Sequence, residues 1–162
     1  MRTDYIYAIL IFIPLTVLQL TIIPLISFNQ IAPDLILIVL VYYTLKLGQI
    51  HGTILGFIMG LIFDMVSGGV IGSAMFAKTM SGFLTGYFYN ENKMEFNLNS
   101  FMLLLIIFGV GSIDSVIYTF FSTTEINTSL FMLIFMQGLL PGLYSAVVSL
   151  PLIIFYPRKL FS

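Results

Sequence analysis

Apolar segments long enough to cross a lipid bilayer occupy almost the whole of this 162-residue chain. A helix needs about 20 residues to cross the roughly 30 Å of bilayer hydrocarbon. Hydrophobic residues make up 59% of the sequence and charged residues only 8%, so there is too little polar side chain to coat a soluble globule. The sequence therefore predicts an all-α integral membrane protein with a single domain over residues 1–162.

Short polar clusters divide the chain into six apolar segments. The expected transmembrane helices cover approximately residues 5–27, 35–47, 49–66, 70–89, 98–121 and 130–156. The first segment lacks a small-residue cleavage site, so we expect it to stay in the protein as an anchor. The polar runs NENKMEFN and STTEINTS are expected to be loops outside the bilayer, and Pro141 and Pro151 are expected to bend the last helix.

The positions of the basic residues predict how the chain is oriented. Short cytoplasmic loops hold an excess of Lys and Arg. With the amino terminus inside, the cytoplasmic side carries Arg2, Lys46, Lys93, Arg158 and Lys159, and only Lys78 lies within a span. We therefore expect six crossings of the membrane, with both termini in the cytoplasm.

Small residues recur at every fourth position in two successive segments. The third segment carries Gly48, Gly52, Gly56 and Gly60. The fourth carries Ala74, Gly82 and Gly86 at the same spacing, with Lys78 at the position between Ala74 and Gly82. Association of helices in lipid depends on close packing, and small residues four apart let two backbones approach. The Gly68–Gly69 turn then predicts a tight antiparallel hairpin. Two interpretations remain open for the glycines: packing inside the bundle, or a contact face for another protein.

Charged residues inside the spans need a separate explanation, because each costs roughly 2.5–3.5 kcal/mol near the bilayer centre. At about 1.5 Å per residue from the outer ends, Lys78 and Asp114 lie about 10–12 Å deep and Asp64 lies nearer the outer surface. Three interpretations remain open. Lys78 and Asp114 form an ion pair that holds helices together, they form part of a substrate or ion site, or Lys78 extends outward towards Asp64.

Other features of the sequence argue against a catalytic site, a metal site or a nucleic-acid-binding surface. The chain has no cysteine, so it has no disulfide, thiolate metal ligand or cysteine nucleophile. Its formal net charge of −1 gives no sign of the basic surface that binds nucleic acid. His51 is the sole histidine and has no companion at metal-ligand spacing. Serine-nucleophile and phosphate-binding glycine motifs are absent. We therefore expect no enzyme activity, no metal and no cofactor.

Several short motifs between Pro33 and Phe88 resemble one known family. Pro-Asp-Leu opens the second segment, a basic residue precedes Gly48, and the glycine-rich segment ends in Gly-Leu-x-x-Asp at Asp64. Ser-Gly at Ser67 and Gly-Tyr near the end of the fourth segment follow. This run, about a third of the chain, resembles the MreD family of bacterial rod-shape-determining proteins, whose size and six-span layout are also similar. Lys78 lies outside the matched pattern.

The resemblance implies a non-enzymatic inner-membrane scaffold or regulator of the cell-elongation machinery. Such a protein binds MreC and helps link MreB filaments to peptidoglycan synthesis by RodA and a class B penicillin-binding protein. Two groups of residues in this sequence would form its site. One is the glycine stripe, which consists of the glycines at four-residue spacing: Gly48, Gly52, Gly56, Gly60, Gly82 and Gly86. The other is an outer-turn motif formed by Pro33, Asp34, Asp64, Ser67 and Gly68. We expect hydroxyl or backbone donors to hold the Asp64 carboxylate.

An alternative function comes from the same resemblance. MreD proteins are similar to the substrate-binding subunits of energy-coupling-factor transporters, which have six helices and an outward-facing vitamin pocket. Asp64, Lys78 and Asp114 can line such a pocket. The scaffold is preferred because the outer loops are short and supply few polar groups to close over a vitamin.

Overall fold

The computed structural model describes residues 2–27, 31–93, 98, 101–122 and 134–151. The elements in this part of the chain are helices: α1 Arg2–Thr21, α2 Ile23–Ile26, α3 Leu35–Leu47, α4 Gln49–Ser67, α5 Ser73–Gly86, η1 Glu91–Lys93, α7 Phe101–Ser122, the π-helix η2 Phe135–Leu139, and α9 Leu140–Val148. The prediction of an all-α fold is confirmed for these residues.

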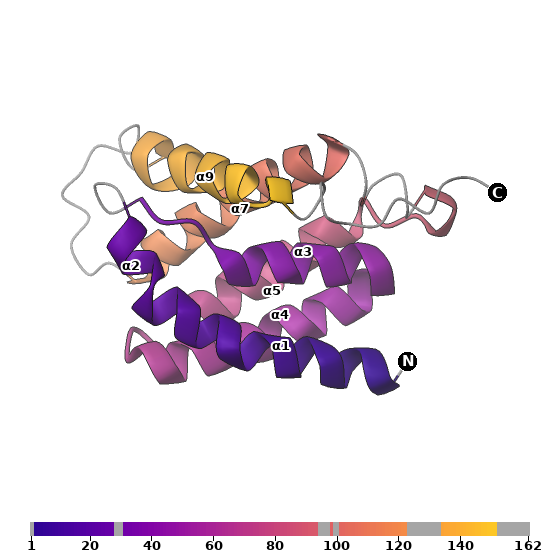
Figure 1. Cartoon of the computed structure of the whole chain (residues 1–162), viewed down its shortest axis with the longest axis horizontal. Coiled ribbons are helices and arrows are strands. Elements are labelled where there is room, and N and C mark those ends of the chain that lie inside the picture. The colour runs from indigo at the N-terminus through magenta and orange to yellow at the C-terminus, as the bar shows by residue number, and fades with distance from the viewer. Residues whose placement is uncertain (1, 28–30, 94–97, 99–100, 123–133, 152–162) are drawn as a thin grey trace.

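The long helices lie side by side along one common direction (Figure 1). In that view α7 and α9 form the upper layer, α3 and α5 the middle, and α1 and α4 the lower. The closest packing joins α4 to α5, and α7 packs on both α5 and α9. The α4 and α7 helices are each long and apolar enough to cross a membrane, and shorter apolar helices occupy Leu10–Thr21, Leu35–Leu47 and Phe135–Val148.

Helix α3 is the centre of the bundle. One of its faces packs with α7 in a cluster that includes Leu37, Val41 and Ile107. The opposite face packs with α1 and α4 in a second cluster that includes Leu40 and Met59. A helix that is apolar all round is buried on several sides, and this is why a segment of 13 residues occupies the core.

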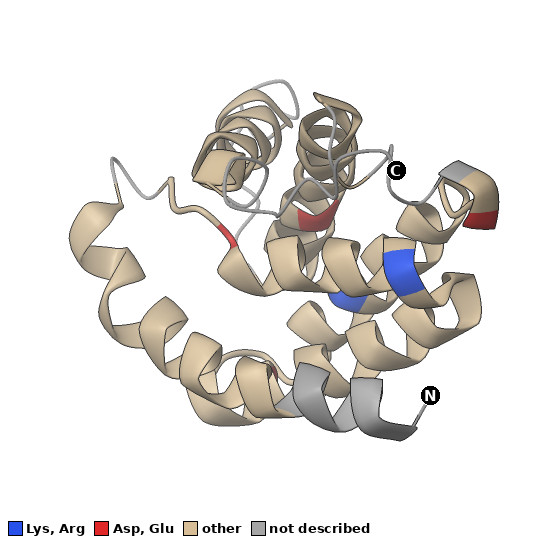
Figure 2. Cartoon of the chain, turned by 45° about the vertical axis from the view of Figure 1, so that its right-hand side comes forward, with Lys and Arg blue, Asp and Glu red and all other residues tan. Residues whose placement is uncertain are grey.

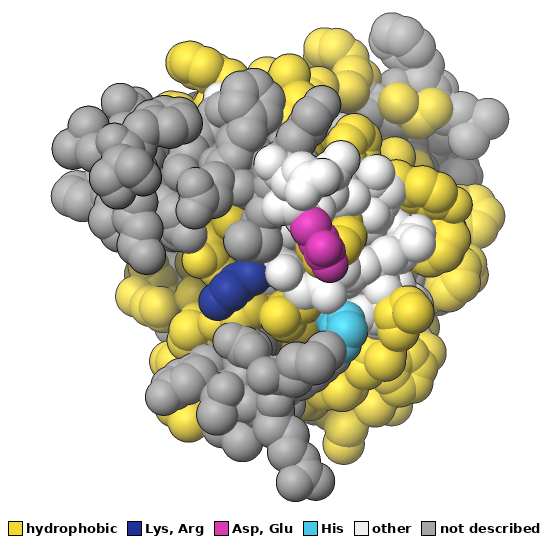
Figure 3. Space-filling model, turned by 90° about the vertical axis from the view of Figure 1, so that its right-hand side faces the viewer, with side chains coloured by type: hydrophobic (Ala, Val, Ile, Leu, Met, Phe, Trp, Pro, Cys, Tyr) yellow, Lys and Arg dark blue, Asp and Glu magenta, His cyan; other side chains and the backbone are white. Residues whose placement is uncertain are grey.

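Apolar side chains also cover most of the outward helix faces, whereas charged residues occupy isolated positions on the ribbon (Figure 2). Acidic, basic and histidine side chains are exposed at one end of the bundle, beside hydrophobic surface (Figure 3). At this end α3 ends at Leu47 and α4 begins at Gln49. The basic residue Lys46 lies here, so this is the end predicted to face the cytoplasm.

Several helix boundaries differ from the sequence-based prediction. The first segment forms two helices, because Pro24 has no N–H group with which to continue α1. The fourth begins at Ser73 instead of residue 70, after Gly72 adopts a left-handed φ of 104°. In the expected loops, Glu91–Lys93 form η1, while residues 94–97 and 123–129 lie outside the described residues. Residues 130–133 and 152–156 of the sixth segment, with Arg158 and Lys159, also lie outside them.

Candidate functional site

The glycines of α4 pack against the backbone of α5. A Cβ atom on Gly56 would collide with the carbonyl group of Lys78. A Cβ atom on Gly60 would collide with the backbone at Ala74 and Met75. Neither contact involves the end of a flexible side chain, so neither can be relieved without moving a helix.

The same packing continues towards the other end of the hairpin. A Cβ atom on Gly82 would meet the backbone of Gly52, and one on Gly86 would meet Gln49. The partner residue moves backward along α5 as the position advances along α4, so the two helices are antiparallel. Of the two interpretations of the stripe, the structure shows packing within the chain.

Gly48 and Gly52 have additional roles. Gly48 lies between α3 and α4 with a φ of 98°, a backbone conformation that favours glycine, and its N–H group donates to the Thr44 carbonyl at 2.9 Å. A Cβ atom on Gly52 would also collide with the side chain of Thr44. The stripe therefore fixes α3 as well as α5.

The Asp64 carboxylate is buried and holds the start of α5. It accepts hydrogen bonds from the backbone N–H groups of Gly72 at 2.8 Å, Ala74 at 3.0 Å and Met75 at 3.0 Å, and from Ser73 Oγ at 3.3 Å. The first N–H groups of a helix have no partner within it, and a carboxylate there also interacts favourably with the helix dipole. Asp64 thus gives the first N–H groups of α5 a hydrogen-bond acceptor that only water would otherwise supply.

The remaining outer-turn residues close neighbouring helix ends. Gly68 ends α4 with a φ of 68°, and Ser67 Oγ donates to the Asp64 carbonyl at 3.4 Å. The Gln19 side chain of α1 donates from Nε2 to the Pro33 carbonyl at 3.0 Å and accepts from the Leu35 N–H at 3.0 Å. These bonds tie α1 to the chain just before α3.

Asp34, Lys78 and Asp114 form one charged cluster, which we call the ionic triad. Lys78 Nζ lies 2.5 Å from Asp34 Oδ2 and 2.5 Å from Asp114 Oδ2. The ammonium group, from α5, therefore joins the start of α3 to the middle of α7. Lys78 and Asp114 are the expected partners. Asp34 had been expected only as a residue of the outer turn, and Asp64 is held by backbone donors instead of by Lys78.

Each carboxylate of the triad also accepts a second hydrogen bond. Asp34 Oδ1 accepts from the Leu37 N–H at 2.9 Å and so caps α3. Asp114 Oδ1 accepts from Ser81 Oγ at 2.8 Å. The exposed fractions of the side chains are 23% for Asp34, 5% for Lys78 and 3% for Asp114. Asp34 is thus the member that a molecule outside the core can reach.

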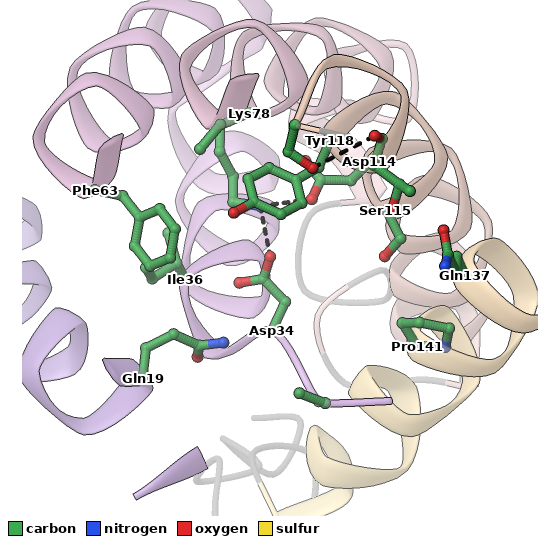
Figure 4. Close-up of a pocket in the computed structure, with 14 residues that line it drawn as sticks. Gln19, Asp34, Ile36, Phe63, Lys78, Asp114, Ser115, Tyr118, Gln137 and Pro141 are labelled. Carbon is green, nitrogen blue, oxygen red and sulfur yellow. Dashed lines mark hydrogen bonds and ion pairs between the residues drawn. The ribbon is translucent and has the colours of Figure 1, made fainter. Parts of the chain in front are cut away.

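The triad borders a cavity of about 320 Å³ between α1, α3, α4, α5, α7 and the η2–α9 segment (Figure 4). The polar residues that line it, besides the triad, are Gln19, Ser115, Tyr118, Thr119, Ser122 and Gln137. Apolar lining comes from residues such as Phe63 and Pro141. Across the described residues, no group of three or more His, Asp or Glu is placed to hold a metal ion.

A comparison with known families identifies the chain. The family model described as rod shape-determining protein MreD matches residues 1–159. The chain belongs to the MreD family. The family's role is in rod-shape determination, and it is a family of membrane-associated proteins. No curated protein and no solved structure gives a significant match. The resemblance first seen over a third of the sequence is therefore confirmed, and it extends over nearly the whole chain.

Sequence reasoning missed a second close helix contact in this MreD-family bundle. A Cβ atom on Gly142 would collide with the Phe108 carbonyl and the Ser112 side chain, and one on Gly138 would collide with Val116. These glycines are four residues apart, so the spacing rule applied to α4 would have found them. They bring the η2–α9 segment against α7, which carries Asp114.

Two serines that support the triad were also missed. Ser81 lies one helical turn after Lys78 on α5 and donates to Asp114. Ser145 of α9 is buried, and its Oγ accepts from the Asp34 N–H at 2.8 Å. The spacing of Ser81 from Lys78 was a usable signal, because residues three apart share a helix face. Nothing in the spacing of Ser145 indicates its partner.

The π-helix η2 lies beside the cavity, where Pro141 was expected to bend the last helix. The N–H group of Leu140 donates to the Phe135 carbonyl, five residues back, and Pro141 has no N–H group to donate to Gln137. A π-helix is rare and often marks a functional site. In this MreD-family chain it places Gln137 and Pro141 in the cavity wall.

Proposed function

We propose that this protein is a non-enzymatic scaffold or regulator of the cell-elongation machinery in the bacterial cytoplasmic membrane. It binds MreC and helps link MreB filaments to peptidoglycan synthesis by RodA and a class B penicillin-binding protein. The observation that carries the proposal is the MreD family match over residues 1–159.

The course of the chain supports six crossings. Successive long segments, α1, α3, α4, α5, α7 and η2–α9, alternate in direction along the common axis (Figure 1). Such alternation brings both ends of the described chain to the same side. The most extensively buried of these segments, α3, packs against protein on both sides. Because α3 is surrounded by other helices, its length of 13 residues does not have to match the thickness of the bilayer hydrocarbon.

The packing of α4 leaves one of its faces available for a membrane helix of MreC. The glycine face of α4 is covered by α5. The opposite face of α4 carries exposed apolar side chains at helical spacing: Ile50, Ile54, Phe57 and Met65. We propose this exposed α4 face as the MreC contact, because it continues the family's glycine-rich helix and leaves the hairpin intact.

Co-isolation and crosslinking test the proposal. A photo-crosslinking amino acid at Ile54 or Phe57 should give an adduct with co-expressed MreC. The same amino acid at Leu105, an exposed apolar position on α7, is the matched control and should give none. Co-isolation of MreC with adducts only from Leu105 would move the contact to α7. Failure to co-isolate MreC at all would refute the binding role.

A second candidate function is a vitamin-binding subunit of a transporter. The cavity beside the ionic triad favours it, since small-molecule sites are hollows with a few convergent polar groups. Mass spectrometry of the purified protein should find a co-purified vitamin if this function is correct. A bound vitamin without an MreC complex would favour the transporter subunit over the scaffold.

A further inference from the structure

The ionic triad leaves one formal negative charge without a partner beside the cavity. Lys78 supplies one ammonium group, and it contacts two carboxylates. An uncompensated charge in a medium of low dielectric constant is costly, so a second cation near the triad would be stabilised. An anionic ligand would instead face a site of its own sign.

Three polar side chains in the cavity wall have hydrogen-bonding capacity to spare. The side chains of Ser115, Tyr118 and Gln137 form no hydrogen bond with other residues in the described part of the chain. A hydroxyl or an amide oxygen can accept from a cationic N–H group. Asp34, the most exposed member of the triad, also has lone pairs left after its two hydrogen bonds.

Two aromatic rings line the same cavity. Figure 4 shows Phe63 and Tyr118 directed towards the space that Asp34 also faces. Aromatic faces attract ammonium and guanidinium groups, and the attraction is stronger where water is excluded. The free hydrogen-bond acceptors, the two aromatic rings and the extra negative charge of the triad therefore all favour a cationic ligand.

We propose that this cavity binds one guanidinium or primary ammonium group. A cavity of about 320 Å³ is at the small end of ligand sites, so it fits one basic side chain or a small organic cation. Asp34 is the principal acceptor, Tyr118 and Gln137 complete the contact, and Lys78 with Asp114 hold Asp34 in place. The proposal goes beyond the scaffold role and does not depend on MreC binding.

Calorimetry on the purified protein, without MreC, tests the site. The probe is N-acetyl-arginine amide, and N-acetyl-citrulline amide is its neutral isostere. The arginine probe should bind at least about tenfold more tightly, as expected when a charge-assisted hydrogen bond replaces a neutral one. No binding of the arginine probe, or equal binding of the two probes, would overturn the proposal.

Two variants locate the site. Asp34→Asn removes the excess charge, leaves Lys78 paired with Asp114, and should weaken binding about tenfold or more. Tyr118→Phe deletes a hydroxyl that has no partner among the described residues, so it should fold normally and weaken binding about twofold to tenfold. Tyr87→Phe is the matched control, since Tyr87 lies outside the cavity and is exposed. Unchanged binding in both cavity variants would contradict the assignment.

A competition experiment separates the two sources of the cation. If the group is a basic side chain of MreC, saturating arginine probe should lower co-isolation of MreC. If it is a free small cation, co-isolation should be unchanged while the probe still binds. Both results retain the site, and they differ only in what occupies it.

Discussion

At the scale of single residues, the ionic triad explains how a lysine lies in the middle of an apolar bundle. The side chain of Lys78 is 5% exposed, and each partner carboxylate is fixed by a further hydrogen bond. A buried ion pair adds little net stability, but removing one partner leaves an unpaired buried charge. The three residues should therefore differ sharply in their tolerance of substitution.

The first prediction concerns Lys78→Met. This change leaves the buried Asp114 carboxylate and the partly exposed Asp34 carboxylate without a cation, and it should destabilise the protein by about 3–5 kcal/mol. Asp34→Asn, which leaves a paired Lys78 and Asp114, should cost less. The measurement is the midpoint of thermal aggregation in detergent, read by size-exclusion chromatography. Combining Lys78→Met with Asp34→Asn and Asp114→Asn should restore part of the lost stability, and equal midpoints for the two single variants would argue against the triad.

The second prediction compares two aspartates. Asp64→Leu should reduce the amount of folded protein and impair cell-shape complementation more than Asp34→Leu. The reason is that Asp64 satisfies three backbone donors at the start of α5, whereas Asp34→Leu leaves Lys78 paired with Asp114. Asp64→Asn, which keeps one acceptor oxygen, should lie between wild type and Asp64→Leu. The same loss from both leucine variants would count against the role of Asp64.

At the scale of elements, two close helix contacts build the bundle. One joins α4 to α5 through Gly56, Gly60 and Gly82, and the other joins α7 to the η2–α9 segment through Gly138 and Gly142. Without a hydrophobic driving force between helices in lipid, such close backbone packing supplies the attraction. The first contact also positions Lys78 on α5, and the second positions Asp114 on α7.

The third prediction uses a matched pair of glycines. Gly56→Ala should lower the thermal midpoint, because its Cβ would collide with the Lys78 carbonyl. Gly109→Ala should leave the midpoint unchanged or raise it slightly, because Gly109 lies in α7 with open space around it and alanine is the better helix former. A Gly56→Ala protein as stable as Gly109→Ala would contradict close packing at α4.

The sequence predicted part of this arrangement. The four-residue spacing identified the α4–α5 hairpin. Close approach of two helix backbones requires small residues on one face of each helix, and this requirement is visible in the sequence of each helix alone. The contact of Asp34 with Lys78 could not be predicted in the same way. Asp34 was expected at the outer turn before the second segment, and periodicity does not show which helices are lateral neighbours. The contact of Gly142 with α7 had a visible signal, because Gly138 and Gly142 show the same four-residue spacing.

At the scale of the whole molecule, the account depends on a bundle whose segments alternate in direction. Asp34, Asp64 and the cavity then lie towards the outer side, and Lys46 with the polar end of Figure 3 lies towards the cytoplasm. The MreD family match spans residues 1–159 and agrees with a membrane-associated protein in rod-shape determination. In this orientation the proposed cation site opens towards the outer side, and the proposed MreC contact lies on the exposed face of α4.

The most direct test is the location of the C-terminus. Fusions of the full chain to green fluorescent protein and to alkaline phosphatase report opposite sides of the membrane, since the first is fluorescent in the cytoplasm and the second is active outside it. Six crossings with both termini inside predict a fluorescent first fusion and an inactive second one. An active phosphatase fusion with a dark fluorescent-protein fusion would contradict the account, because the chain would then cross the membrane an odd number of times or in the opposite orientation.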